Sequence, residues 1–159
     1  MTLNKKRYLA LGFVLTWMLV IFIFSGSFGS SNGSASETAI NSVKPYLPSL
    51  SEQVVKVIVR KSAHIFMYGV LGALLANLLR QYSFNRSKVF GYSLLLVLFY
   101  ASFDEIHQYF VGGRSSSPRD VAIDLSGATI GISIYYCFLK LIVKNNGSAG
   151  KKVSHGQEK

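Results

Sequence analysis

Side chains that could do acid–base chemistry or bind anions gather in one short stretch of the sequence, SFDEIHQYFVGGRSSSPRD, residues 102–120. Carboxylates and histidines are the usual general acids and bases, and arginines bind phosphate or carboxylate groups. Apolar runs flank the stretch on both sides, and a charged residue at membrane depth costs about 2.5–3.5 kcal/mol on insertion scales. Ionisable residues placed there are therefore candidates for function.

The composition of the chain indicates a membrane protein. Half of its 159 residues are hydrophobic and 15% are charged, with a mean hydropathy of +0.33, whereas about 25% charged is typical of soluble domains. The formal net charge of +10 would suggest nucleic acid in a soluble protein. Most Lys and Arg residues, however, lie in tails and short connections beside apolar runs, so lipid headgroups account for them and we expect no nucleic-acid partner. The single cysteine, Cys137, excludes a disulfide within the chain.

Four apolar stretches are long enough to cross a hydrocarbon core of about 30 Å. They cover about residues 8–24, 57–79, 88–110 and 119–143. We therefore predict an all-α fold, an integral membrane bundle of four transmembrane helices that forms a single domain over residues 1–143. The basic tail, residues 144–159, is expected to be disordered and cytoplasmic.

The first connection, from Ser25 to Lys56, is expected to be a flexible surface loop followed by a short interfacial segment, in which Ser51 could cap a helix start. The first apolar stretch follows Lys5, Lys6 and Arg7, as the core of a signal peptide would, so its cleavage stays an open alternative to a retained anchor.

The distribution of basic residues predicts the orientation of the bundle. Eleven Lys and Arg residues flank the N-terminus, the 80–88 connection and the C-terminal end, and six lie on the other side. Basic residues favour the cytoplasmic side, so we expect both termini inside (N-in and C-in) and the 25–56 and 111–118 connections outside. Six of the seven acidic residues fall on that outer side.

Helical spacing places several polar residues on shared faces. Arg60, His64 and Tyr68 recur at i, i+4 and i+8, with Lys61 beside them, so they form one stripe of the second helix. Asp104, His107 and Gln108 follow i, i+3, i+4 spacing on the third helix. We expect these two faces to point at one another.

The fourth helix carries further charged residues, which we expect at the same depth in the membrane. Its start reads Ser117-Pro118-Arg119-Asp120, a capping hydroxyl, a proline at the first helical position and a carboxylate. Asp120 and Asp124 align with Gly127 and Gly131, whose G-x-x-x-G spacing lets two helix backbones approach closely in lipid. A tight outer hairpin then brings Asp124 to the level of Asp104.

These faces together predict a polar pocket near the outer surface. Its candidate ligand-binding residues are Arg60, Lys61, His64, Tyr68, Asp104, Glu105, His107, Gln108, Arg114, Arg119, Asp120 and Asp124. Its candidate catalytic residues are His64, Asp104, Glu105 and His107. Structural roles are the alternative: Arg60 and Lys61 as residues reaching for the interface, His64 as a hydrogen bond between helices, and Asp120 as a helix cap.

Familiar motifs add nothing to this pocket. DEIH matches a helicase-type ATPase motif, but the sequence holds no G-x-x-x-x-G-K-[ST], and the H-E-x-x-H of zinc proteases is also absent. Spacing gives a metal ion no specific support, so we expect neither metal nor cofactor.

The chain resembles the VanZ-like family of small bacterial membrane proteins, named for a protein associated with teicoplanin resistance, over about residues 10–140. The matching elements are RKSAH with Tyr68, DEIHQYF, Gly113-Arg114, Arg119-Asp120 with Asp124, Gly127 with Gly131, and a first helix with Trp17 and a terminal IFIFS. Two departures are visible. Met67 stands where family members often carry a glutamate, which removes one carboxylate, and VGGR replaces Val-Pro-Gly-Arg.

The resemblance implies a four-helix protein of the bacterial cell envelope, in the cytoplasmic membrane, with a role in glycopeptide (teicoplanin) susceptibility. It implies no reaction. Our leading hypothesis is an envelope factor that does not transport and whose outer pocket binds an anionic lipid-linked or peptidoglycan-related ligand through its basic residues, with membrane lipids as its other partners.

A membrane-embedded hydrolase or transferase is the alternative, with His107 or His64 as base, Asp104 or Glu105 orienting it and Arg114 stabilising developing charge on a lipid-linked substrate. Whether the chain is an enzyme stays open. Proton or ion movement is disfavoured, because four helices without a broken-helix or inverted-repeat pattern do not resemble a transporter.

Overall fold

The computed structural model describes residues 2–29, 34–110 and 118–154, which form helices and no strand. Four helices are long and apolar enough to cross a membrane. They are α1 (Leu3–Gly29), α3 (Glu52–Arg80), α4 (Arg86–Phe110) and α5 (Pro118–Ser154). The shorter α2 (Ser34–Val43) and the 3-10 helix η1 (Lys44–Tyr46) lie between α1 and α3. The predicted all-α fold with four membrane spans is confirmed, and the chain is a multi-pass membrane protein.

Local signals explain where α3 and α4 begin. The Ser51 hydroxyl accepts a hydrogen bond from the Val54 amide at 3.4 Å, as expected for a helix cap, and Glu52 lies in the first turn, where the helix dipole favours an acid. The segment expected to lie separately at the interface is therefore the first part of α3. Asn85 plays the capping role for α4, since its side-chain oxygen accepts from the Lys88 amide at 2.9 Å.

All four long helices extend beyond the predicted apolar stretches, and α1 and α5 do so by the most residues. α1 covers Leu3–Gly29 rather than 8–24, and α5 continues to Ser154 instead of ending near 143. The tail expected to be disordered from residue 144 is thus helical up to Ser154, and residues 155–159 lie outside the described part. No proline follows Pro118 in the sequence to stop the helix. Hydropathy marks the part of a helix that suits lipid, whereas backbone hydrogen bonding continues into polar sequence.

The connection between α1 and α3 also differs from the flexible loop that we expected. Residues 34–43 form α2, with Glu37 in its first turn, and Ile40 on this helix is buried. Residues 30–33 lie outside the described part.

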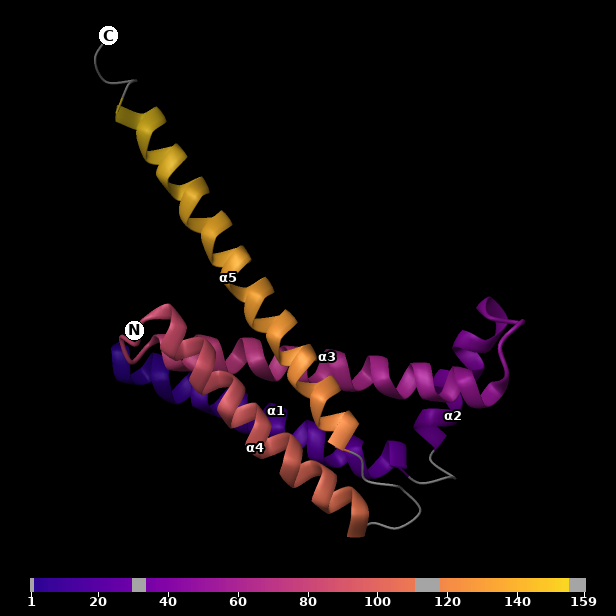
Figure 1. Cartoon of the computed structure of the whole chain (residues 1–159). Coiled ribbons are helices and arrows are strands. Elements are labelled where there is room, and N and C mark those ends of the chain that lie inside the picture. Colours follow the sequence, from indigo (N-terminus) through magenta and orange to yellow (C-terminus); the bar gives the residue numbers. More distant parts are fainter. Residues whose placement is uncertain (1, 30–33, 111–117, 155–159) are drawn as a thin grey trace.

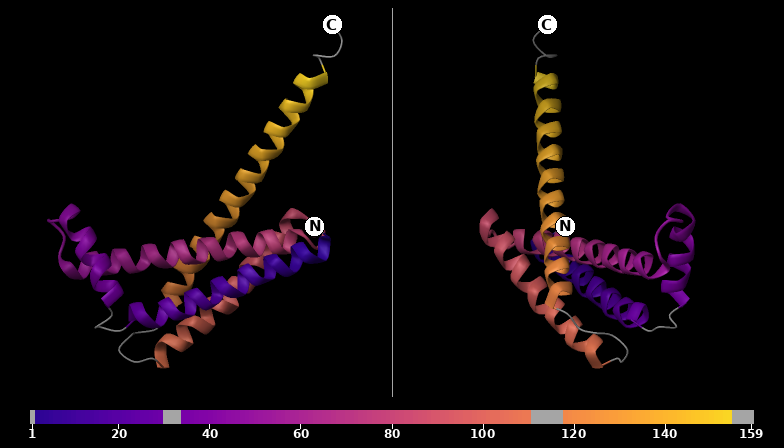
Figure 2. Two further views of the ribbon diagram at one scale, coloured as in Figure 1. Left: turned by 180° about the vertical axis from the view of Figure 1, so that it is seen from behind. Right: turned by 45° about the vertical axis from the view of Figure 1, so that its right-hand side comes forward.

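The helices run in alternating directions (Figure 1). α1, α3 and α4 pack together, whereas α5 crosses α3 and its C-terminal half leaves the other helices, which the two views of Figure 2 also show. The start of α1 lies beside the α3–α4 turn, because the Arg7 guanidinium donates to the Gln81 carbonyl at 2.7 Å and lies over the Tyr82 ring. The N-terminus and the α3–α4 turn therefore share one end of the bundle.

The crossing of α3 and α5 is made of glycines. A Cβ added to Gly131 would lie 1.9 Å from the Gly69 carbonyl oxygen, one added to Gly127 would lie 2.5 Å from that of Ile65, and one added to Gly72 would lie 2.7 Å from that of Ala128. The predicted close approach at Gly127 and Gly131 is confirmed, and we call Gly69, Gly72, Gly127 and Gly131 the glycine crossing. Backbones this close bring the neighbouring side chains of both helices within reach of each other.

The core lies between the helices, and large apolar side chains also cover the outside. Val14, Leu71, Val97 and Ala128 come from four different helices and are buried in one cluster. Phe13, Phe99 and Phe138, by contrast, are each more than half exposed. Exposed rings around the middle of a helix bundle are expected where lipid is the solvent.

Candidate functional site

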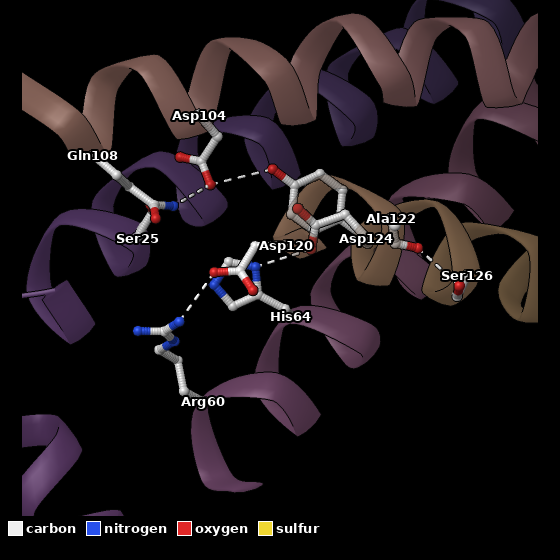
Figure 3. A network of polar contacts seen from close by, with 10 residues as sticks. Ser25, Arg60, His64, Asp104, Gln108, Asp120, Ala122, Asp124 and Ser126 are labelled. Atoms are coloured by element: carbon white, nitrogen blue, oxygen red, sulfur yellow. Dashed lines mark hydrogen bonds and ion pairs between the residues drawn. The ribbon is translucent and has the colours of Figure 1, made fainter. Parts of the chain in front are cut away.

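A buried carboxylate, Asp104, lies at the centre of a hydrogen-bonded cluster in the halves of the helices that lie away from the N-terminus (Figure 3). Asp104 is 2% exposed. Its Oδ2 accepts from the Tyr68 hydroxyl at 3.2 Å and from Gln108 Nε2 at 2.8 Å. Gln108 Nε2 also donates to the Ser25 hydroxyl at 2.6 Å. The group of bonds joins α1, α3 and α4, so the position of Asp104 depends on all three helices.

A second buried carboxylate, Asp124 of α5, pairs with a histidine. His64 Nδ1 lies 2.9 Å from Asp124 Oδ1, and Asp124 is 1% exposed. The His64 ring also stacks on Tyr68, with ring centroids 6.2 Å apart and planes 12° from parallel. An ionised carboxylate can only accept a hydrogen bond, so His64 carries a proton on Nδ1 when Asp124 is charged. Tyr68 therefore contacts both halves of the site, Asp104 by its hydroxyl and His64 by its ring.

An ion pair lies beside the histidine pair. The Arg60 guanidinium is 3.0 Å from Asp120 Oδ2, with the arginine side chain 31% exposed and the aspartate 9% exposed. Asp120 is in the first turn of α5, where a carboxylate is favoured by the helix dipole. The Arg60 and His64 pairs repeat one turn apart along α3 and α5, as the i, i+4 spacing of both pairs requires. We call Ser25, Arg60, His64, Tyr68, Asp104, Gln108, Asp120 and Asp124 the polar cluster.

A small cavity lies against the polar cluster. Its volume is about 40 Å³, which is room for a water molecule or a single hydroxyl group. Its polar lining is Ser25, Arg60, His64, Tyr68 and Asp104, and its apolar lining is Ile21, Phe24, Ala63 and Met67. The residue type that departs from the family pattern, Met67, thus lies in the wall of this cavity.

Two carboxylate oxygens in the cluster lack hydrogen-bond donors among the described residues. Asp104 Oδ1 and Asp124 Oδ2 are both buried and accept no bond there. Buried polar atoms are nearly always satisfied by protein or by ordered water. These oxygens are therefore places where water or a donor group of a ligand can bind.

The remaining predicted site residues lie apart from this cluster. His107 packs against Phe22 of α1, with ring centroids 4.2 Å apart, and does not line the cavity. Lys61 is half-buried next to Arg60 and forms no ion pair with a described residue. Glu105 is buried and Arg119 is exposed, and neither lines the cavity. Arg114 lies outside the described residues, as do Ser115 to Ser117.

The contribution of α1 was missed by reasoning from the sequence, which placed the site on three helices. Ser25 bonds Gln108, and Trp17 Nε1 donates to the Met67 carbonyl at 2.9 Å. Tyr100 similarly donates to the Met18 carbonyl at 2.5 Å. The family resemblance did include Trp17 and the IFIFS that ends in Ser25, but it gave neither residue a role in the site.

Among the described residues, no three His, Cys, Asp or Glu side chains are grouped so that they could hold a metal ion.

Comparison with known proteins supports the resemblance that the sequence predicts. No curated protein and no solved structure matches the chain. A family model described as VanZ/LLP1 matches residues 10–140, which include all four membrane spans in large part and the whole polar cluster. The chain belongs to the VanZ/LLP1 family.

Proposed function

We propose that this protein binds the head of an anionic lipid-linked cell-wall intermediate at the outer face of the bacterial cytoplasmic membrane. The proposal takes residues 1–143 as one membrane domain with both termini in the cytoplasm, as the distribution of basic residues favours. A role in teicoplanin susceptibility follows if the ligand belongs to peptidoglycan synthesis.

The position of Arg60 is the observation that supports this proposal most strongly. It is a partly exposed guanidinium on the lining of the cavity, next to Lys61 and one turn from His64. Arginine suits phosphate because its planar fork donates two hydrogen bonds at once. The described cluster also holds three aspartates, so we place the phosphate at the rim, near Arg60 and Lys61, and not in the interior.

The interior suits the uncharged part of such a head. Asp104 Oδ1 and Asp124 Oδ2 are acceptors without a donor among the described residues. The cavity of about 40 Å³ admits a hydroxyl or a water, not a whole sugar. A hydroxyl near the phosphate of the ligand would supply the missing donor and select for sugar-bearing lipids.

Binding of undecaprenyl phosphate to the purified protein in detergent tests the proposal. Arg60→Gln should raise Kd about tenfold, the loss of one charge-assisted hydrogen bond. Lys88→Gln serves as the matched control, because it removes one positive charge near the opposite end of the bundle. Equal affinity of wild type and Arg60→Gln would overturn the proposed site.

A deletion strain connects the site with the cell. Strains complemented with wild type or with Asp104→Asn are compared for teicoplanin sensitivity and for accumulated envelope lipids. We expect the Asp104→Asn strain to behave like the deletion. Full complementation by Asp104→Asn would separate the phenotype from the polar cluster.

The pairing of His64 with Asp124 favours hydrolysis as a second candidate function. A carboxylate that holds one imidazole nitrogen orients the other for proton transfer, and here the pair lies beside a water-sized cavity. The oxygen of a water molecule would attack the terminal phosphorus of a polyprenyl diphosphate, and the water would give its proton to His64. The bridging P–O bond would break, giving polyprenyl phosphate and inorganic phosphate.

Phosphate release separates this candidate from binding alone. Purified protein is incubated with undecaprenyl diphosphate, and phosphate is measured over time for wild type, His64→Gln and His107→Gln. The structure favours His64 as the base, so His64→Gln should lose release while His107→Gln keeps most of it. No release by wild type leaves binding as the function.

A further inference from the structure

A second candidate binding site lies at the other end of the bundle, where α5 separates from α3 and α4. Beyond the glycine crossing, Ile132 still packs on Ala76 and Val89. The rest of α5 then leaves the other helices (Figures 1 and 2). In a membrane, the space between two diverging helices must be filled by lipid or by side chains, because empty apolar space is unfavourable.

Basic and aromatic side chains line this wedge. A groove of about 410 Å³ is bounded by Arg80, Phe84, Arg86, Tyr136, Leu139 and Lys140, which we call the basic groove. A second groove of about 470 Å³ shares Arg86 and Tyr136 and continues along Ser87, Phe90 and Ser133. Together they form a surface with a cationic entrance and an adjoining side that includes Phe90.

The cations of the basic groove have no acidic residue nearby in the sequence. There is no Asp or Glu between Glu52 and Asp104, and none between Asp124 and Glu158. Arg80, Arg86 and Lys140 therefore add their positive charges without neutralisation by a described carboxylate. An anionic ligand would complement the positive charge at this end of the bundle.

Aromatic contacts hold part of the groove in place. The Arg86 guanidinium lies 4.3 Å from the centre of the Tyr136 ring, a cation–π contact that limits the motion of both side chains. The neighbouring Tyr135 donates to Asn77 Oδ1 at 3.1 Å, which ties α5 to α3 at this level. Arginine and tyrosine at the end of a membrane span are typical of the headgroup region.

We propose that the basic groove binds an anionic glycerophospholipid from the leaflet on the side of the N-terminus. The phosphate lies among Arg80, Arg86 and Lys140, and an acyl chain follows the wedge past Phe90 and Leu139. Basic pockets between membrane helices recognise anionic headgroups in this way. This site is independent of the function proposed above, because it lies on the opposite side of the glycine crossing from the polar cluster.

Native mass spectrometry of the full chain, released from detergent, tests this site. The probes are dioleoyl phosphatidylglycerol, dioleoyl phosphatidylcholine and inorganic phosphate. Wild type should bind phosphatidylglycerol at least fivefold more tightly than phosphatidylcholine, and millimolar inorganic phosphate should not remove this preference. Equal binding of the two lipids, or loss of the preference in phosphate, would overturn the lipid site.

Four variants show which residues give the lipid preference. The double variant in which Arg86→Gln and Lys140→Gln are combined, called the pair below, should reduce the preference for phosphatidylglycerol below twofold. Lys88 lies on α4 outside the groove, so Lys88→Gln should keep the preference. Arg86→Lys keeps the charge, loses the planar contact with Tyr136 and should lie between wild type and the pair. A loss as large in Lys88→Gln as in the pair would assign the effect to net charge and overturn the site. Arg60→Gln should leave the preference unchanged, so the two proposed sites succeed or fail separately.

Discussion

The glycine crossing and the polar cluster lie next to each other on the interface of α3 and α5, yet they are built in opposite ways. At the crossing the helices meet because side chains are absent, and a Cβ on Gly131 would lie 1.9 Å from a backbone oxygen. Less than one turn from Gly127, His64 and Asp124 instead meet through the ends of their side chains, in a contact of 2.9 Å.

The difference indicates that the two regions of this interface have different roles. Gly127 contacts Ile65, and these residues lie three positions from Asp124 and one position from His64. The crossing therefore sets the distance across which the polar partners meet. We expect the crossing to determine the stability of the bundle and the polar cluster to determine what it binds.

The largest effect is expected at the crossing. Gly131→Ala places a Cβ against the Gly69 carbonyl, and backbone cannot move aside as a flexible side chain can, so the cost is about 3 kcal/mol, the upper part of the usual range for overpacking. Thermal unfolding in detergent measures it. Gly91→Ala is the matched control, because Gly91 is helical and has open space around its Cβ position; equal stability of the two variants would contradict the close crossing.

Removal of Asp124 should come next. Asp124→Ala leaves His64 without its carboxylate and should cost about 1–2 kcal/mol, the range of hydrogen bonds between membrane helices. His64→Ala together with Asp124→Ala should cost less than the two changes added, because both remove the same contact. Ser126→Ala, at an exposed position of α5, is the control. Strict additivity in this cycle would mean that the pair contributes nothing to stability.

The Tyr68 hydroxyl is expected to contribute less. Tyr68→Phe removes one of the two donors to Asp104 Oδ2 and leaves the bond from Gln108 in place, so we expect a loss of about 1 kcal/mol in the same unfolding measurement. Tyr92→Phe provides the comparison at an exposed position of α4. A Tyr68→Phe protein as stable as Tyr92→Phe would show that Gln108 and Ser25 hold Asp104 by themselves.

Arg60→Gln should have the smallest effect on stability. Its ion pair with Asp120 is partly exposed, and exposed pairs are typically worth about 0.2–1 kcal/mol, so we expect a loss of about 0.5 kcal/mol. The same change is expected to weaken ligand binding tenfold, so stability and binding should separate at this residue. A loss of stability as large as that of Asp124→Ala would make Arg60 a structural residue instead.

The i, i+4 pattern predicted much of the polar cluster but not its partners. The stripes Arg60–His64 and Asp120–Asp124 do meet, because two helices that cross closely bring equal spacings into register. The pattern treated His107 and Gln108 alike, yet Gln108 bonds Asp104 while His107 packs on Phe22. Spacing limits which residues share a face, and it does not say which neighbour that face will meet.

The sequence alone determined the four membrane spans, the family and the starts of α3 and α5. These depend on local properties: the length of an apolar run, a capping serine at 51, a proline at 118 and motifs read along the chain. Each of them needs only residues that are close together in the sequence.

Only the tertiary structure decided that α1 joins the site through Ser25, that Gly69 faces Gly127 and Gly131 while Gly72 faces Ala128, and that α5 leaves the bundle to form the basic groove. These features join residues that are far apart in the chain. Their positions depend on how whole helices pack and cross, which is a balance over all the contacts between them. A single periodic pattern carries no information about that balance.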